Sequence, residues 1–259
     1  MHFKIKIMKN ILISSKKILS NQIIFNFFYY LIHSNIIFGY IHKKFFNHFK
    51  YKNYLFFVKN INIPLSHYSS FFFKTYEIND RILLEKFLTK KNKCLIIGAG
   101  IGFTSVLTYK ITRNKVFCFE INKNLKPVLF KNFLLNKVKY KLFFKNLVFK
   151  KNSKKIYFES KDNFLENNIY NKGKTSEAKN LFFKKIPIKK FNTLIIDAEG
   201  YEYEILKNLN KLKKINYIFF ELHPKLLNKK KQKEIFKILK VNRFKKELDF
   251  LNSYYFKKI

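Results

Sequence analysis

A glycine-rich turn between two apolar runs is the first stretch of the chain whose residue types suit ligand binding. Residues 94–97 are all apolar, as a strand buried on both faces of a parallel sheet requires. Gly98, Gly100 and Gly102 follow, so the backbone can turn sharply with no Cβ to keep a ligand away. Residues 103–113 then have a helical pattern, and the N-terminus of that helix would direct unpaired N–H groups toward the turn. This stretch therefore has the form of a ligand-binding strand–turn–helix unit.

The residue that ends the next apolar run indicates the kind of ligand. Residues 116–119 are followed by Glu120, which lies 22 residues after Gly98. An acid about 20 residues beyond such a turn commonly accepts hydrogen bonds from ribose hydroxyls. We therefore predict a nucleoside-cofactor site. Its predicted residues are Gly98, Ala99, Gly100, Gly102, Glu120, Asn122 and, near the adenine ring, Asn146.

The position of the third glycine indicates which nucleoside cofactor the site would bind. The dinucleotide fingerprint Gly-x-Gly-x-x-Gly requires a glycine at the position that Phe103 occupies here, whereas the chain has Gly102 instead. The resulting Gly-x-Gly-x-Gly pattern is typical of S-adenosylmethionine-dependent methyltransferases. Binding of NAD or FAD, and a turn that binds no ligand, are the two alternatives at this stage.

A second group of polar residues follows two later apolar runs. Residues 193–196 lead into Asp197 and Glu199, and residues 215–220 lead to His223. Because the carboxyl ends of parallel strands meet at one edge of a sheet, these three side chains should face the glycine turn. Asp197, Glu199 and His223 are the candidate catalytic bases, in that order. Two nearby carboxylates leave a divalent cation open, but we predict no metal site. The later acids Glu202 and Glu204 have an ordinary explanation, since acids in the first turn of a helix suit its dipole.

The overall composition is strongly basic. The chain has 259 residues, 47% hydrophobic, and a net charge of +38 from 54 Lys and Arg against 16 Asp and Glu. Such a charge is typical of proteins that bind nucleic acid or anionic membranes. The lysines are spread along the whole chain, however, and Trp is absent while Asn, Ile, Phe and Tyr abound, which favours a general compositional bias. Cys94 and Cys118 fall inside predicted core strands, so we expect them to be packing residues of a cytoplasmic protein.

The first 60 residues differ from the rest. Residues 23–41 have the length of a membrane span, but polar side chains near the centre disfavour one. Residues 23–50 could instead form a basic, aromatic helix that lies on an anionic membrane surface, or helices that pack on the rest of the protein. We therefore divide the chain into an N-terminal helical segment, 1–60, and a catalytic domain, 61–259, with peripheral membrane association left open.

The remaining pattern alternates apolar runs with helical segments. We expect helices over residues 77–90, from 122 onward, 201–209 and 231–239, with Asn79 or Asp80 capping the first. Further strands are expected over 140–149 and 155–159, with a hairpin over 244–259. Residues 71–76 could be a short strand or a covering segment, and 167–180 a polar loop.

Four motifs occur in the order found in one known family. Residues 94–102, 119–122, 197–202 and 220–223 resemble the FkbM family of methyltransferases, and the resemblance covers about residues 75–259. The chain departs from that family at Ile96, Gly100 and Ile121, where Asp, Asn and Pro are usual. The resemblance implies an α/β fold of the Rossmann-like class I methyltransferases: a mostly parallel twisted sheet, helices on both faces and an antiparallel strand near the C-terminus. It also implies S-adenosylmethionine as methyl donor and O-methylation of a hydroxyl on a sugar, a glycan or another small molecule.

Two other functions remain as alternatives. An RNA methyltransferase would use the basic surface, but the Asn/Asp-Pro-Pro-aromatic motif common in enzymes that methylate base amino groups is absent. Nucleic acid is therefore not favoured as a partner. A decayed domain kept as a membrane-associated binding protein is the second alternative, because Ile96 replaces the usual acid.

Overall fold

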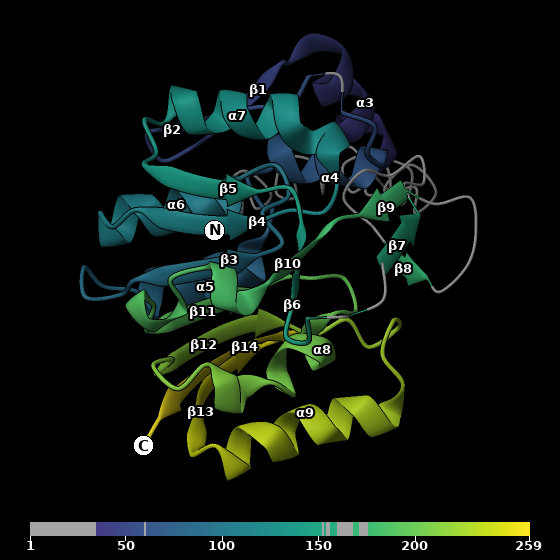
Figure 1. Ribbon diagram of the computed structural model, residues 1–259. Helices are drawn as coiled ribbons and strands as arrows, with labels where there is room; N and C mark the ends of the chain where they lie inside the picture. Colours follow the sequence, from purple (N-terminus) through teal and green to yellow (C-terminus); the bar gives the residue numbers. More distant parts are fainter. Residues whose placement is uncertain (1–34, 60, 152, 154–155, 160–167, 171–175) are drawn as a thin grey trace, which may run out of the picture.

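The computed structural model describes residues 35–59, 61–151, 153, 156–159, 168–170 and 176–259 (Figure 1). Predictions for residues 1–34, which include most of the 23–41 stretch, lie outside these residues. None of the helices in the described part of the chain has the length and hydropathy needed to cross a membrane.

A seven-stranded sheet forms the centre of the protein. Five of its strands run parallel. A C-terminal hairpin adds two antiparallel strands at one edge, where one strand of the hairpin pairs with the last parallel strand. In sheet order the strands are β13 (Phe244–Phe250), β14 (Ser253–Lys258), β12 (Tyr217–Glu221), β11 (Thr193–Ile196), β3 (Cys94–Ile97), β4 (Val116–Phe119) and β5 (Tyr140–Phe143). The fold class predicted from the sequence is therefore confirmed.

Helices cover both faces of this sheet because its central strands are apolar on both sides. Every residue of β3 and β11 is buried, and Ile96 and Ile97 belong to two different hydrophobic cores. The core around Ile96 includes residues of α5 (Ile78–Phe87), α6 (Phe103–Thr112) and α7 (Lys126–Leu135). The core around Ile97 includes residues of α8 (Glu202–Leu206) and α9 (Lys229–Val241). Cys94 and Cys118 are free and buried, as expected of packing residues.

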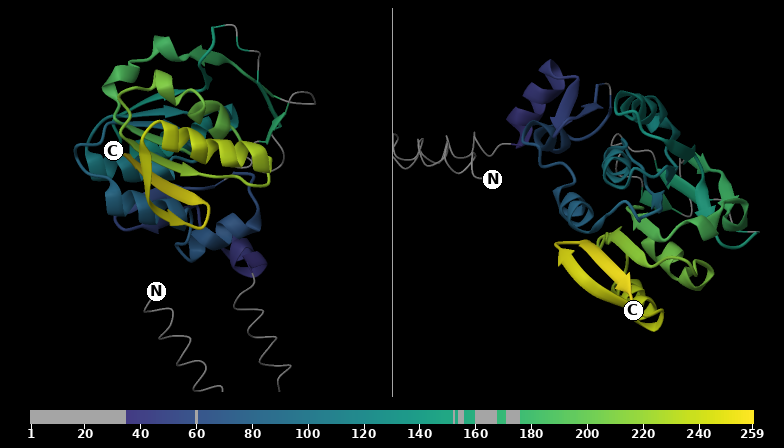
Figure 2. Two further views of the ribbon diagram at one scale, coloured as in Figure 1. Left: turned by 90° about the horizontal axis from the view of Figure 1, so that it is seen from below. Right: turned by 90° about the vertical axis from the view of Figure 1, so that its left-hand side faces the viewer.

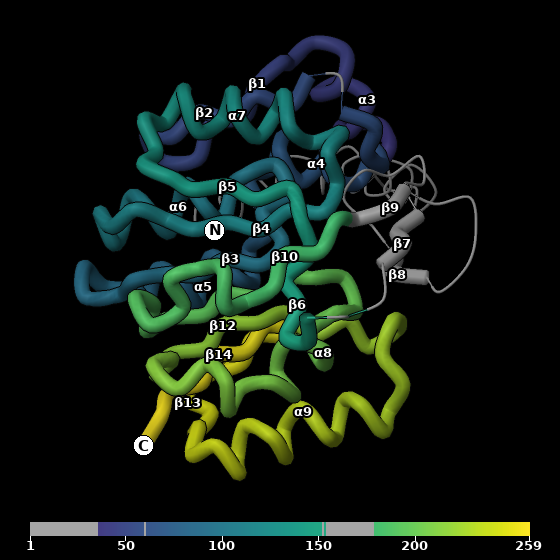
Figure 3. The backbone as a smooth tube through the Cα atoms, in the orientation of Figure 1, coloured from purple at the N-terminus to yellow at the C-terminus, as the bar shows by residue number. Residues whose placement is uncertain are grey.

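The described N-terminal residues pack onto the rest of the protein. They form α3 (Asn35–Phe45), the hairpin strands β1 (His48–Tyr51) and β2 (Tyr54–Phe57), and α4 (Leu65–Phe72). The hairpin lies beside α7 (Figure 3), where the Asn132 side chain hydrogen-bonds both the N–H and the carbonyl of Phe57. Phe49 and Phe56 are buried against Phe103. Residues 48–57 thus contribute to the same core as the sheet.

Several local predictions are wrong. The helix expected through residue 50 ends at Phe45, because a hairpin follows. Residues 71–76 include the end of α4, so the short strand, one of the two alternatives for this stretch, is not formed. Helix α5 begins after Glu77, which has a left-handed backbone, so neither Asn79 nor Asp80 is its cap. Helix α8 is short and a 3-10 turn follows it.

The region after β5 also differs from expectation. The strand expected over residues 140–149 is two strands, β5 and β6 (Asn146–Val148), and β6 pairs with β10 (Asn180–Phe182). The expected polar loop contains β8 (Asn168–Tyr170) and β9 (Ser176–Ala178), which flank β7 (Ile156–Glu159) in a small antiparallel sheet. Strands of three residues are too short for an alternating pattern to show in the sequence.

Candidate active site

A cavity of about 830 Å³ opens at the carboxyl edge of the parallel strands. Its wall is formed by residues that follow β3, β4, β11 and β12, together with residues of β6 and α4. In open α/β sheets ligands bind outside the carboxyl ends of the strands, so the cavity lies where the fold predicts a site.

The glycine turn after β3 forms one side of this cavity. Gly98 and Gly100 line it, and both have positive φ angles, as Gly102 does. A Cβ on Gly98 would lie 1.6 Å from the Asp197 carbonyl oxygen, so only glycine allows the turn to approach the end of β11 this closely. A Cβ on Gly102 would meet Leu129 at 2.7 Å, which indicates that this glycine serves the packing of α6 on α7. Ala99 is buried behind the turn, where its N–H donates to the Phe119 carbonyl.

Glu120 holds the glycine turn in place. Its side chain is buried at the end of β4, and its two carboxylate oxygens accept hydrogen bonds from the N–H groups of Gly100 and Asn122, both at 2.8 Å. Burial raises the pKa of Glu120, and the backbone donors oppose that effect. The residue lines the cavity, and its oxygens retain lone pairs for further donors.

The two predicted asparagines differ in position. Asn146 lines the cavity, and its side-chain amide donates to the Tyr201 hydroxyl and to the Asn180 side chain, each at 3.3 Å. Asn122 is buried, and its side chain accepts from the Asn124 N–H at the start of the following helical turn. Asn122 therefore supports the loop beside Glu120, whereas Asn146 has access to a ligand.

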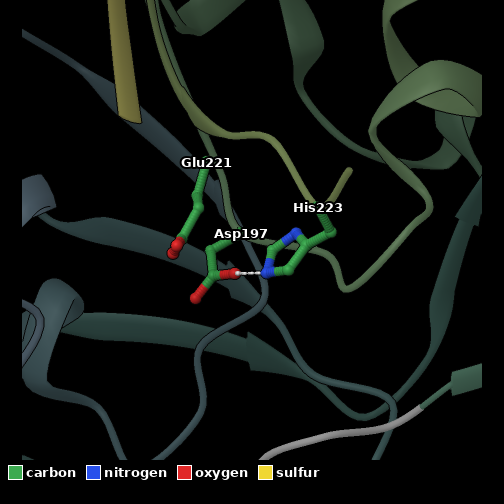
Figure 4. A group of neighbouring side chains, drawn as sticks. All are labelled: Asp197, Glu221 and His223. Carbon is green, nitrogen blue, oxygen red and sulfur yellow. Dashed lines mark ion pairs between the residues drawn. The ribbon is translucent and has the colours of Figure 1, made fainter. Parts of the chain in front are cut away.

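The three candidate catalytic residues come together in the same cavity, beside the glycine turn. His223 Nε2 lies 3.6 Å from Asp197 Oδ1 and 3.3 Å from Glu199 Oε2. Glu221, at the end of β12, also lines the cavity, and Asp197 lies between Glu221 and His223 (Figure 4). Glu199 has a positive φ of 44°, an uncommon backbone conformation for a non-glycine residue that directs its side chain into the cavity. The spatial grouping expected from the sequence is therefore present.

Sequence reasoning missed three acidic residues of this site. Glu202 is fully buried, and its Oε1 lies 2.8 Å from His223 Nδ1 and accepts from the Gly200 N–H at 3.0 Å. Glu77 lines the cavity and accepts a hydrogen bond from the Thr104 hydroxyl at 2.5 Å. Glu221 lies in the motif of residues 220–223, but the sequence analysis gave this residue no role. An acid that follows an apolar strand was the available signal for Glu221. Glu202, unlike Glu204, lies within the family-like motif of residues 197–202, but its position in a first helical turn gave it an ordinary explanation.

A family model described as the methyltransferase FkbM domain matches residues 97–257. The chain belongs to the FkbM methyltransferase family. It is therefore an S-adenosylmethionine-dependent methyltransferase with a Rossmann-like fold. No curated protein matches its sequence.

Solved structures resemble this FkbM methyltransferase only distantly. The ribosomal protein L11 methylase from Lactobacillus delbrueckii subsp. bulgaricus is 15% identical, with 70% of this chain and 77% of that chain covered and a TM-score of 0.42. TYW2 from P. horikoshii, in complex with MeSAdo, is 12% identical, with 81% and 68% covered and a TM-score of 0.46. A tRNA m1G37 methyltransferase from M. jannaschii is 14% identical, with 82% and 56% covered and a TM-score of 0.43. Similarity at this level carries no conclusion about the substrate.

The cavity of the methyltransferase is acidic although the protein is strongly basic. Five of the 16 Asp and Glu residues line it: Glu77, Glu120, Asp197, Glu199 and Glu221. Burial lowers the pKa of His223, but the hydrogen bond to Glu202 and the charges of Asp197 and Glu199 outweigh this and raise it to about 10. Burial and the charge of Glu221 raise the pKa of Asp197. The excess of carboxylates fits S-adenosylmethionine, whose sulfonium and ammonium groups are cationic, and the glycine turn beside Glu120 fits its ribose.

Proposed function

We propose that the protein methylates a hydroxyl group of a sugar, a glycan or another small molecule. The observation that carries this proposal is the meeting of Asp197, Glu199 and His223 in a cavity that the glycine turn and Glu120 also line. This arrangement provides a cofactor region and, next to it, carboxylates that can take a proton from an acceptor.

In this proposal, different residues contact different parts of S-adenosylmethionine. Glu120 would bind the ribose hydroxyls, Gly98 and Gly100 would border the cofactor with their backbones, and Asn146 would contact the adenine. The cofactor supplies an activated methyl group on its sulfonium. Positioning of the acceptor oxygen in line with that group can contribute about 7–11 kcal/mol of the barrier reduction.

The carboxylates of the cavity would accept the proton of the acceptor hydroxyl. When the acceptor oxygen takes the methyl group that bound S-adenosylmethionine would supply, Asp197 or Glu199 would receive the hydroxyl proton. A positioned base typically adds about 10² to 10⁴ in rate. His223 bridges the two carboxylates and is oriented by Glu202.

The remaining wall of the cavity favours a small polyhydroxyl acceptor. It includes Ser66, His67 and Ser70 from α4 and Asn252 from the β13–β14 turn, which offer hydrogen-bonding groups, together with Lys145 and Lys225. RNA is disfavoured, because the carboxylates at the reactive end would repel its phosphates. The acceptor proposed here is therefore uncharged around its hydroxyl.

The test combines cofactor binding with product analysis. Calorimetry should show that S-adenosylhomocysteine binds and NAD does not. Incubation with isotopically methyl-labelled S-adenosylmethionine and a panel of glycans should then give a product whose NMR signal is that of an O-methyl group. Tighter binding of NAD, or a label found only on nitrogen or on RNA, would contradict the proposal.

We also propose that the region around α3 contacts an anionic membrane surface from the cytoplasmic side. Several large apolar side chains on this helix and just after it are exposed: Ile36, Ile37, Tyr40, Phe45 and Phe46. Lys43 and Lys44 lie among them, and the Lys44 ammonium is 5.8 Å from the centre of the Tyr40 ring and 5.5 Å from that of Phe45. Aromatic side chains mixed with lysines suit the interface of an anionic bilayer. Helix α3 packs on α4, which also lines the cavity, so an acceptor at the membrane would be close to the site.

A further inference from the structure

We infer that the acidic end of the cavity is a binding site for one divalent cation, with Asp197, Glu221 and His223 as its protein ligands. One ligand atom from each of these residues lies within 4.8 Å of the other two (Figure 4). The inference rests on the proposed function, because a cation here would contact the acceptor hydroxyl of the O-methylation. The His and Cys spacings in the sequence predict no such site, since the three ligands come from two strand ends that only the fold brings together.

The orientation of His223 is the first reason. Its Nδ1 lies 2.8 Å from Glu202 Oε1, and the Glu202 side chain is completely buried. Histidines that bind metals almost always donate their second ring nitrogen to a carboxylate or a carbonyl, which fixes the ring and the tautomer. Glu202 has this role here, so Nε2 points toward Asp197, where a bound cation would take the place of its proton.

The spacing of the ligand atoms is the second reason. His223 Nε2 and Asp197 Oδ1 are 3.6 Å apart, which is longer than a hydrogen bond. Asp197 Oδ1 is buried and has no hydrogen-bond partner among the described residues. Two atoms that share an ion at about 2.0–2.2 Å lie roughly 3–3.5 Å apart, close to the observed separation. A buried acceptor without a donor is costly, and a cation between these atoms would satisfy it.

The charge of the cluster is the third reason. Asp197, Glu199, Glu202 and Glu221 surround a single imidazole. Asp197 and Glu199 both lie beside His223, and Asp197 and Glu221 each have a ligand atom within 4.8 Å of a His223 ring nitrogen. A divalent ion bound among these groups would offset part of their negative charge. Bound there, it would lower the pKa of an acceptor hydroxyl and hold its oxygen beside Glu199.

Manganese is a suitable probe, because Mn²⁺ accepts mixed nitrogen and carboxylate ligands and its free ion has a strong paramagnetic resonance signal. Titration of the full-length protein with Mn²⁺ should show one site per chain. Asp197→Asn and Glu221→Gln should each weaken binding by at least tenfold. Glu204→Gln is the matched control, because Glu204 lies on the same helix as Glu202 but pairs with Lys207 outside the cavity. This control should bind Mn²⁺ as the wild type does.

The same samples distinguish this inference from the proposed function. S-adenosylhomocysteine calorimetry on each variant reports whether the fold and the cofactor region are intact. If wild type binds the cofactor product but no Mn²⁺, or if the variants bind Mn²⁺ as tightly as the control, the cation site is wrong and the methyltransferase proposal is unaffected. If the cation binds but O-methylation of every acceptor fails, the proposed substrate class is wrong while the cation site stands.

Discussion

Glu120 connects the cofactor region to the backbone that forms it. Both of its oxygens accept from backbone N–H groups, so the carboxylate orders the glycine turn before any ligand arrives. A preformed site of this kind spares the cofactor the entropy of ordering the loop. Glu120 therefore contributes to affinity in two ways, through its own hydrogen bonds and through the shape of the turn.

Substitution of Glu120 tests this role. Glu120→Ala should weaken S-adenosylhomocysteine binding by roughly 1.5–3 kcal/mol, the range for hydrogen bonds to a charged group. Calorimetry measures the affinity, and urea unfolding confirms that the variant is folded. Glu247→Ala removes an exposed acid from β13 with the same change of charge, so it should leave affinity unchanged. Equal affinity in the two variants would place the ribose elsewhere.

Glu77 gives the protein a pH-dependent stability. Burial raises the pKa of Glu77 from 4.5 to about 7, although the Thr104 hydroxyl opposes this. The folded state thus holds a proton that the unfolded state has lost, and the free energy of unfolding falls as pH rises from about 4.5 to about 7. Glu77→Gln should remove this component, so the variant should gain on the order of 1–3 kcal/mol relative to wild type between pH 5 and pH 8.

Urea unfolding of both proteins at several pH values measures this difference. The subtraction cancels the other titrating groups that the two proteins share. A difference that stays constant across the pH range would show that Glu77 titrates normally. A Glu85→Gln variant serves as the control, because Glu85 pairs with Lys52 away from the cavity.

For single residues, the sequence predicted where a side chain would lie better than it predicted which side chains it would contact. Asp197, Glu199 and His223 could be placed because each follows an apolar run that had to be a strand. Glu202 could not, because its role depends on burial, and burial depends on how α8 packs under the turn of His223. The sequence pattern of an acid in a first helical turn is the same for Glu202 and for the half-exposed Glu204.

At the scale of elements, the turn after β3 is held by its contact with the end of β11. Gly98 and Gly200 have nearly equal φ angles, 90° and 94°, but different surroundings. A Cβ on Gly98 would meet the Asp197 carbonyl oxygen at 1.6 Å, whereas one on Gly200 would meet only the Leu226 side chain, at 3.0 Å. Substitution of Gly98 and of Gly200 therefore compares a clash with a backbone carbonyl with the strain of a left-handed conformation.

Alanine substitution at these two positions tests the contact. Gly98→Ala should reduce the free energy of unfolding by roughly 3 kcal/mol or more, because a backbone carbonyl has to move. Gly200→Ala should cost about 1–2 kcal/mol, from the strain of a left-handed residue and a contact that a small shift of the Leu226 side chain can relieve. Urea unfolding compares the two. Equal losses would mean that the strand ends separate easily and that the turn is not fixed by β11.

The elements predicted well share one physical property: they form the interior of the sheet. Strands β3, β4, β11 and β12 appear as apolar runs because both of their faces are covered. The β1–β2 hairpin was missed because its residues, such as Lys50 and Tyr51, mix charged and aromatic side chains. The pairing of that hairpin with α7 depends on Asn132 and Asn136, and no local pattern reveals such long-range hydrogen bonds.

At the scale of the whole molecule, positive and negative charges are unevenly distributed. A net charge of +38 surrounds a cavity lined by carboxylates, so the surface attracts anions while the site attracts cations. Helix α3 and the β13–β14 hairpin lie at opposite ends of the protein (Figure 2), and large exposed apolar side chains occur at both. Around α3, five such side chains lie on or just after one helix together with Lys43 and Lys44, more than on any other helix of the described part of the chain. This difference gives the membrane proposal a test by substitution.

Substitution is a better test than truncation, because removal of residues 1–60 would take Phe49, Phe56 and Val58 out of the core. A variant with Ile36, Tyr40 and Phe45 changed to Ser loses exposed apolar area from α3 and keeps every charge. The control changes Leu134, Val241 and Leu251 to Ser, three residues at least as exposed, at 79%, 72% and 74%, and distant from α3 in the sequence.

Co-sedimentation with phosphatidylglycerol vesicles at low and high salt decides between dedicated and general binding. A dedicated interface has an apolar contribution that salt does not screen, so wild type and control should stay partly bound at high salt. The α3 variant should then bind about tenfold more weakly, since three exposed side chains no longer enter the bilayer interface. Binding driven by lysines alone predicts another result, in which all three proteins bind equally at low salt and detach together at high salt. That outcome would leave α3 without a membrane role and would assign vesicle binding to the basic composition of the whole chain.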